Sequence, residues 1–338
     1  MSRTRKWIGL GGKIGLTTAI LGFLAVRLPL AEIPAQISQL DLRWLAVAWL
    51  CLALSIIIST ARWRLLLAVQ GLRLSFARLL RLTMIGQFFN AFLLGSTGGD
   101  LVLMLYVSRE TSTDRGRAAL SVIGDRLLGL GGLIVWALAV MPFLLHRLND
   151  APDLRRILSI VLWLLALIVI AGVAAIVVLA RPGPAATIKR AITRLPFGTK
   201  AAVGVEAAAD CVRHRRLTAQ AVAIGLIVPF VMVTAGWCLT RSLGLTIRFG
   251  DLAGVLPLVL VVSSLPISIG GFGPREGSLA VLFPAFGLVS PAESLIAVTF
   301  SLLWYFLTVT WSIVGGLIYH FTPLNDQNMQ ADSHRTNL

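Results

Sequence analysis

Three groups of charged residues lie inside or beside long apolar stretches of this sequence. They are Asp100 after Gly98-Gly99, the pair Asp125-Arg126, and the pair Arg275-Glu276, which follows Gly270-Gly271-Phe272-Gly273-Pro274. A charge at the centre of a bilayer costs about 2.5–3.5 kcal/mol, so we expect these side chains to bind one another or a polar ligand.

The pair Arg275-Glu276 has the residue types of an anion site. Proline is favoured at the first position of a helix, so Pro274 predicts that both residues open one. A helix N-terminus adds free N–H groups and partial positive charge, and the guanidinium fork suits phosphate. Arg275 would then bind phosphate while Glu276 orients it. The alternative is an internal salt bridge that pins the turn.

The other two groups also have two interpretations each. Asp100 could bind a cationic group, or it could cap a helix that begins at Leu101. Asp125-Arg126 could be a pair of charged residues at the membrane interface, or it could line a cavity and contact Asp100 or a ligand headgroup. The five glycines beside the charges would permit tight turns and close approach of headgroups.

Known catalytic and metal-binding patterns are missing from the sequence. It has no GxSxG, HExxH, CxxC or Walker loop, and its three cysteines and four histidines are scattered. We therefore expect no cofactor, no metal and no enzymatic activity. The net charge of +15 comes mostly from loops beside apolar runs, a pattern typical of proteins at anionic membrane surfaces, so nucleic acid is not an expected partner.

Composition predicts the elements that position these residues. Hydrophobic residues make up 57% of the chain and charged residues only 13%, against about 25% charged in soluble domains. Apolar runs long enough to span a membrane predict an all-α polytopic membrane protein. The runs are Ile8–Val26, Trp44–Ala61, Ala118–Leu145, Ile157–Ala180, Leu217–Thr240 and Leu295–His320. The first is read as an uncleaved span rather than a secretory signal.

Two further apolar stretches, Leu82–Val107 and Leu252–Val289, are broken by the glycine-rich turns. Irregular backbone at membrane depth must be buried in protein or line a wet cavity, so we read both stretches as re-entrant segments, for about eight hydrophobic segments in all. With the N-terminus inside, the inner loops then hold 20 Lys and Arg, including the cluster Arg62–Arg81, and the outer loops 7. Eight simple spans would give 14 against 13, without the expected positive-inside bias.

The two breaks lie about half a chain apart. A division near Asn149 gives each half three crossings and one re-entrant segment, which predicts inverted repeats with a substrate site near the midplane. Residues 1–322 form the expected membrane domain. Within it, the basic stretch 181–216 is read as a solvated loop or as an interfacial helix on anionic headgroups. Residues 323–338 form a polar tail that we expect to be disordered.

These motifs resemble those of the lysylphosphatidylglycerol synthase transmembrane (flippase-like) family. The resemblance rests on Leu265–Glu276 and on Gly98-Gly99-Asp100 followed by Asp125-Arg126, and it covers roughly Trp7–Thr322. Members of the family typically carry an arginine shortly after the Gly-Gly-Asp, where this chain has Leu103. In bifunctional members a soluble aminoacyl-transfer domain follows; here the chain stops 18 residues after His320, so lysyl transfer is not expected.

The resemblance implies a protein of the cytoplasmic membrane that translocates lipids. The leading hypothesis is a translocase without its own ATPase for an anionic or polyprenyl-phosphate-linked lipid, with the three charged groups and their glycines in contact with the headgroup. One alternative is a lipid-modifying transferase that uses Asp100 and Glu276 as acid and base. The other is a non-catalytic scaffold whose basic loop docks enzymes of envelope-lipid biosynthesis.

Overall fold

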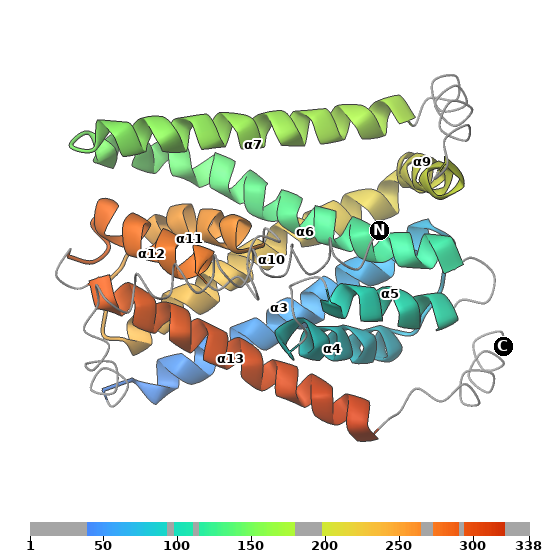
Figure 1. The fold of residues 1–338 in the computed structure, drawn as a ribbon, viewed down its shortest axis with the longest axis horizontal. Helices are drawn as coiled ribbons and strands as arrows, with labels where there is room; N and C mark the ends of the chain where they lie inside the picture. Colours follow the sequence, from blue (N-terminus) through green and yellow to red (C-terminus); the bar gives the residue numbers. More distant parts are fainter. Residues whose placement is uncertain are drawn as a thin grey trace, which may run out of the picture.

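Long helices run along the molecule (Figure 1). The computed structural model describes residues 39–92, 98–110, 115–179, 198–264, 273–290 and 294–321. The long helices are α3 (Leu42–Val69), α6 (Arg115–Leu144), α7 (Pro152–Leu179), α10 (Arg215–Ser242) and α13 (Ser294–Phe321). All five are long and apolar enough to cross a membrane, since 28 residues extend about 42 Å against a hydrocarbon core of about 30 Å. The prediction of a helical, multi-pass membrane protein is confirmed.

The first broken stretch forms a hairpin of two short helices, α4 (Phe76–Phe92) and α5 (Gly98–Glu110), which pack on each other. They extend about 26 and 20 Å, so neither arm spans a core of about 30 Å. An ion pair of 3.2 Å joins Arg78 Nη1, in the first turn of α4, to Glu110 Oε2 at the end of α5. Entry and exit therefore lie at the same end of the bundle, as the re-entrant prediction requires.

The second broken stretch forms a corresponding hairpin, α11 (Phe249–Ser264) and α12 (Pro274–Ala285). Every residue of α11 from Leu252 to Val261 is buried, so this helix is surrounded by protein. Its neighbours include Phe283 and Phe300, the largest side chains with almost no exposed surface. The long apolar run was therefore correctly predicted to be interrupted, and its first arm forms part of the core.

The helices α3–α6 and α10–α13 form two units that are inverted relative to each other. The central pair, α3 and α10, is antiparallel, because the Asp41 N–H at the start of α3 donates to the Ser242 carbonyl at the end of α10 (3.0 Å). Around this pair α4 of the first unit packs on α13 of the second, and α11 of the second packs on α6 of the first. Both α3 and α10 end in the same way, at a glycine with φ of 76°, Gly71 and Gly244.

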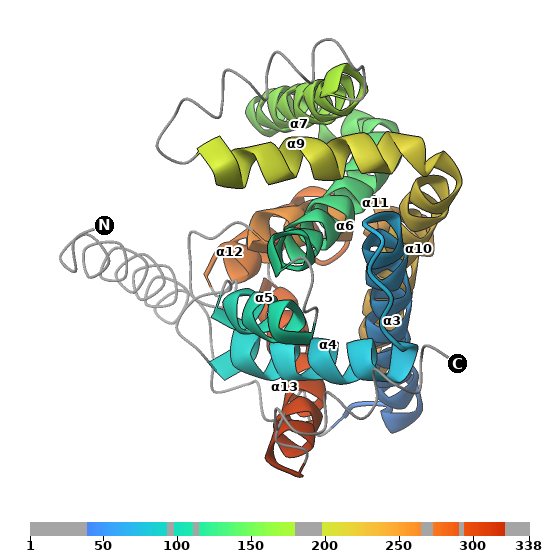
Figure 2. The same cartoon turned by 90° about the vertical axis from the view of Figure 1, so that its right-hand side faces the viewer.

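Among the described residues, the helices α7 and α9 (Gly198–Arg213) lie between the two units. The chain turns near the predicted boundary at Asn149, where a short 3-10 helix, η2 (Leu145–Leu148), precedes α7. The long axis of α9 is nearly perpendicular to the spans: Figure 1 shows α9 end-on and Figure 2 shows it lengthwise. The predicted first span, the basic residues 181–197 and the polar tail lie outside the described residues, so the total of about eight segments stays a prediction.

Candidate functional site

The charged residues singled out from the sequence occupy two separate places in the fold. Asp100 lies in the first turn of α5 beside Arg126 of α6, whereas Arg275 and Glu276 lie in the first turn of α12. The helices α5 and α12 do not form a packed pair; α5 packs on α6 and α12 packs on α13. Among the associated glycines, Gly98 and Gly99 open α5 and Gly273 precedes α12, while Gly270 and Gly271 lie outside the described residues.

An ion pair joins the tip of the first hairpin to α6. Arg126 donates to Asp100 Oδ1 from Nε (3.0 Å) and from Nη2 (2.6 Å). The Asn90 amide, from the last turns of α4, donates to the same oxygen at 3.2 Å and accepts from the Gly99 N–H at 2.9 Å. Because α5 begins at Gly98, Asp100 lies inside the helix, and the suggested cap for a helix starting at Leu101 is wrong. A carboxylate in this turn is stabilised by the helix dipole.

This ion pair is open on one side. The Arg126 side chain is 51% exposed and that of Asp100 is 16% exposed. All the hydrogen bonds to the Asp100 carboxylate go to Oδ1, so Oδ2 has no partner among the described residues, and neither has Arg126 Nη1. The contact predicted between Arg126 and Asp100 is present, and it leaves a guanidinium donor and a carboxylate oxygen available to a ligand.

The neighbouring residue, Asp125, points in another direction. Consecutive residues of an α-helix are rotated by about 100°, so Asp125 faces α3, where Arg62 binds both of its oxygens at 2.8 and 3.0 Å. The side chains are 5% and 16% exposed. Asp125-Arg126 is therefore not one unit, and each member bonds to a different helix. Arg62, which the sequence placed in a charged inner loop, is a buried residue of α3.

Glycines make room for Arg62 between the helices. A Cβ added to Gly129 of α6 would lie 3.1 Å from Arg62 Nη2, and one added to Gly225 of α10 would lie 3.7 Å from Arg62 Cδ. Nearby, a Cβ on Gly132 would overlap the Gly225 carbonyl oxygen, so α6 and α10 touch through their backbones. The glycines of α6 could have indicated from the sequence that another helix packs closely against α6. They do not indicate which charged side chain lies at that contact.

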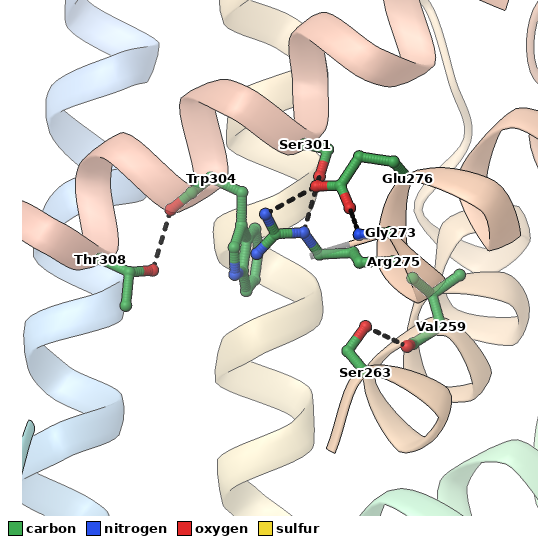
Figure 3. A network of polar contacts seen from close by, with 8 residues as sticks. All are labelled: Val259, Ser263, Gly273, Arg275, Glu276, Ser301, Trp304 and Thr308. Atoms are coloured by element: carbon green, nitrogen blue, oxygen red, sulfur yellow. Dashed lines mark hydrogen bonds and ion pairs between the residues drawn. The ribbon is translucent and has the colours of Figure 1, made fainter. Parts of the chain in front are cut away.

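The second cluster is closed (Figure 3). Arg275 donates from Nε to Ser301 Oγ (2.6 Å) and from Nη2 to Glu276 Oε1 (2.9 Å), and the Ser301 hydroxyl donates to that same oxygen (2.6 Å). The other Glu276 oxygen accepts from the N–H of Gly273 (2.7 Å), whose φ of 87° favours glycine. Arg275 is 7% exposed and Glu276 is 1% exposed.

This geometry matches the internal salt bridge considered from the sequence. Glu276 does orient Arg275, and the Arg275 guanidinium also lies over the Tyr305 ring, 5.8 Å from its centroid. Protein groups therefore engage the guanidinium in this conformation, and its contact with phosphate stays a prediction. Ser301, on α13, was not identified from the sequence, because a single serine in an apolar helix carries no distinguishing pattern.

The two clusters occupy equivalent places in the inverted units. In each, a residue in the first turn of the hairpin's second arm contacts the long helix that follows. Asp100 and Arg126 are 26 residues apart, and so are Arg275 and Ser301. The first site is open and the second is closed by Glu276. The part of the chain that the structure describes contains no group of three or more His, Cys, Asp and Glu side chains placed to hold a metal.

The chemistry that the first site supports is reversible binding of an anion. Arg126 lies nine residues beyond Arg117, about 14 Å along α6. If Arg117 lies at the edge of a hydrocarbon core about 30 Å thick, Arg126 lies near its middle. A guanidinium at that depth needs a polar partner; Asp100 supplies one, and the exposed side of Arg126 can take a phosphate or carboxylate as a second.

Comparison with known proteins identifies the family of the chain. No curated protein and no solved structure matches it. The sequence profile described as the lysylphosphatidylglycerol synthase TM region matches residues 11–315. That match includes both hairpins, both polar clusters and the central pair of antiparallel helices, so the chain belongs to the lysylphosphatidylglycerol synthase transmembrane-region family.

Proposed function

We propose that this protein translocates a phosphate-bearing lipid, either an anionic phospholipid or a polyprenyl-phosphate-linked lipid, across the cytoplasmic membrane without its own ATPase. The observation that carries the proposal is the open ion pair between Asp100 and Arg126. The headgroup phosphate binds the available donors of Arg126 while the acyl or prenyl chains stay in the bilayer. Asp100 keeps the guanidinium oriented before the headgroup arrives.

Binding at this site requires little rearrangement. Arg126 uses Nε and Nη2 on one carboxylate oxygen, which leaves Nη1 for a phosphate oxygen. Hydrogen bonds to charged groups contribute about 1.5–3 kcal/mol each, and part of this gain offsets the repulsion between the phosphate and the Asp100 carboxylate. If the phosphate displaces Asp100, the Asn90 amide and the dipole of α5 continue to stabilise that carboxylate.

Two further observations support translocation. Inverted units with paired broken helices are the architecture of many transporters, with binding sites near the bilayer midplane. Family membership relates the chain to membrane proteins of lipid biosynthesis with flippase-like function. The proposal includes a cytoplasmic N-terminus, as the distribution of Lys and Arg predicts.

The alternative of a lipid-modifying transferase has less support. Glu276, its suggested acid or base, is 1% exposed and bonded to Gly273, Arg275 and Ser301. A general base must reach the proton that it removes, and a carboxylate with these partners does not reach a substrate. A scaffold role for the basic stretch requires partner enzymes of envelope-lipid biosynthesis. It does not explain the open ion pair between Asp100 and Arg126.

The test is leaflet exchange by the purified protein in liposomes. Fluorescent phosphatidylglycerol or a labelled polyprenyl phosphate is placed in both leaflets, and a membrane-impermeant quencher reports the fraction that becomes accessible. We expect exchange with wild-type protein and at least a tenfold slower rate with Arg126→Gln. The matched control is Arg156→Gln, an exposed residue at the start of α7, which should exchange at the wild-type rate.

Three outcomes contradict the proposal in whole or in part. Absence of exchange with every phosphate-bearing lipid would exclude translocation, and a chemically altered lipid without exchange would favour the transferase. Normal exchange by Arg126→Gln would exclude Arg126 as the headgroup contact while leaving translocation intact.

A further inference from the structure

The corner between α9 and α10 exposes a cluster of basic side chains at one end of the bundle. Arg213, Arg215 and Arg216 lie within four residues and are all exposed. Neither Arg215 nor Arg216 has an ion-pair partner among the described residues, and the Arg213 side chain, 78% exposed, lies 3.8 Å from Asp210. From Arg213 to Arg216 the backbone is helical except at His214, which separates α9 from α10.

The two acidic residues of α9 both contact α6, and Asp210 also lies near Arg213 of the corner. Arg117 of α6 contacts Glu206 at 3.4 Å and Asp210 at 3.2 Å, so one arginine of the bundle binds both carboxylates of the helix. Asp210 is only 14% exposed. The inward face of α9 is thereby neutralised, and the corner presents positive charge to its surroundings.

The position of the corner favours a lipid surface over a soluble partner. The helix α9 is nearly perpendicular to the spans (Figures 1 and 2), so it lies parallel to the plane of the membrane at the end of the bundle. Val205, on its inner side, is buried. Because α10 enters the membrane from Arg215, the three arginines lie at the level of the headgroups. Basic residues there are attracted to anionic lipid by about 1 kcal/mol each.

We infer that the corner formed by Arg213, Arg215 and Arg216 is a binding site for anionic phospholipid headgroups of the adjacent leaflet. This inference does not rest on the proposed function. The headgroup phosphates lie against the three guanidinium groups, while Arg117 holds α9 on α6 from the other side. Anionic lipid therefore stabilises the connection between the two inverted units.

The experiment measures binding of cardiolipin to the full chain in a neutral detergent. Native mass spectrometry gives the number and affinity of bound lipids, and thermal unfolding gives the stabilisation, with phosphatidylcholine as the uncharged reference. We expect tighter binding of cardiolipin than of phosphatidylcholine, and weaker binding as NaCl rises. Replacing the three arginines by glutamine should lower the affinity about a hundredfold, since about 1 kcal/mol per residue is about fivefold each.

A matched variant carries the same charge change at the other end of the bundle. Arg155, Arg156 and Arg248 are exposed at the start of α7 and before α11, and their replacement by glutamine should leave the affinity for cardiolipin within about twofold. Lysine in place of the three corner arginines should preserve most of it, because the attraction depends on charge. This conservative variant also controls for misfolding of the glutamine variant.

The inference is wrong if the corner glutamine variant binds cardiolipin as tightly as wild type, or if both glutamine variants lose affinity equally. It is also wrong if cardiolipin and phosphatidylcholine bind alike. Unchanged lipid binding together with lost association with a lipid-biosynthetic enzyme would instead identify the corner as a protein-docking surface.

Discussion

Replacing Arg62 with methionine removes one partner of a buried ion pair and leaves the other in place. Arg62 binds both oxygens of Asp125, and the two side chains are 5% and 16% exposed. Breaking a buried pair in this way costs about 3–5 kcal/mol, because an uncompensated charge remains. We expect Arg62→Met to lower the free energy of unfolding by that amount.

Removal of both charges should have a much smaller effect. Replacing a buried ion pair by apolar residues of similar volume is often neutral or stabilising by about 1–4 kcal/mol. Here Arg62 Nη1 is buried and has no hydrogen-bond partner among the described residues. The free-energy cost of removing this N–H group from water is therefore not offset by a hydrogen bond in the folded protein. The double variant Arg62→Met with Asp125→Leu should therefore be at least as stable as wild type, or within about 1 kcal/mol of it.

The assay is reversible unfolding in bicelles, followed by steric trapping or by denaturing detergent. Arg64→Met is the control, since Arg64 is exposed on the same helix and should change stability by less than about 0.5 kcal/mol. A single variant that loses under 1 kcal/mol would refute the burial argument. A double variant as unstable as the single one would show that the cost comes from lost packing, not from the unpaired carboxylate.

Three further predictions concern packing, the closed cluster and a titrating thiol. Gly132→Ala should destabilise the fold by about 1–3 kcal/mol, because the added methyl overlaps a backbone carbonyl of α10; Gly131→Ala, with nothing within 4 Å, should be neutral or slightly stabilising, as thermal unfolding will show. Ser301→Ala leaves the Arg275 guanidinium short of an acceptor and should cost about 1.5–3 kcal/mol; loss of under 0.5 kcal/mol would contradict this. Burial, and then the charge of Asp210, raise the pKa of the Cys211 thiol above its ordinary value of 9.0. The thiolate fraction is therefore low at neutral pH, and alkylation of Cys211, followed by mass spectrometry, should keep accelerating above pH 9; a plateau below pH 9 would contradict the assignment.

The sequence was sufficient to locate the five long helices and the two breaks, but not every helix end. The lengths of the apolar runs predicted the five spans, because a helix needs about 20 mostly apolar residues to cross the hydrocarbon core. The positions of Lys and Arg favoured re-entrant hairpins over simple crossings, and the ion pair of Arg78 with Glu110 shows the hairpin geometry directly. The prediction that Pro274 opens a helix was also confirmed.

The partners of the charged residues were predicted less well. Composition and spacing do not give the rotation of one helix about its axis relative to its neighbours. This rotation determines that Asp125 forms its ion pair with Arg62 and that Arg126 forms its ion pair with Asp100. Arg62 was counted as a loop charge because the apolar run ends at Ala61, whereas α3 continues to Val69. The sequence thus identified both residues of the open site, Asp100 and Arg126. It did not predict that the neighbouring Asp125 pairs with Arg62 of α3.

The reciprocal packing of α4 on α13 and of α11 on α6 has a consequence for biosynthesis. When the ribosome has completed α6, the helix that covers α4 does not yet exist, and the glycine contact between Gly315 and the Met84 carbonyl forms only when the last helix arrives. The first unit must therefore wait in the membrane, with its hairpin incompletely covered, while about half of the chain is still to be translated. Because each half covers the hairpin of the other, we expect two separately expressed halves to accumulate only when both are made in the same cell.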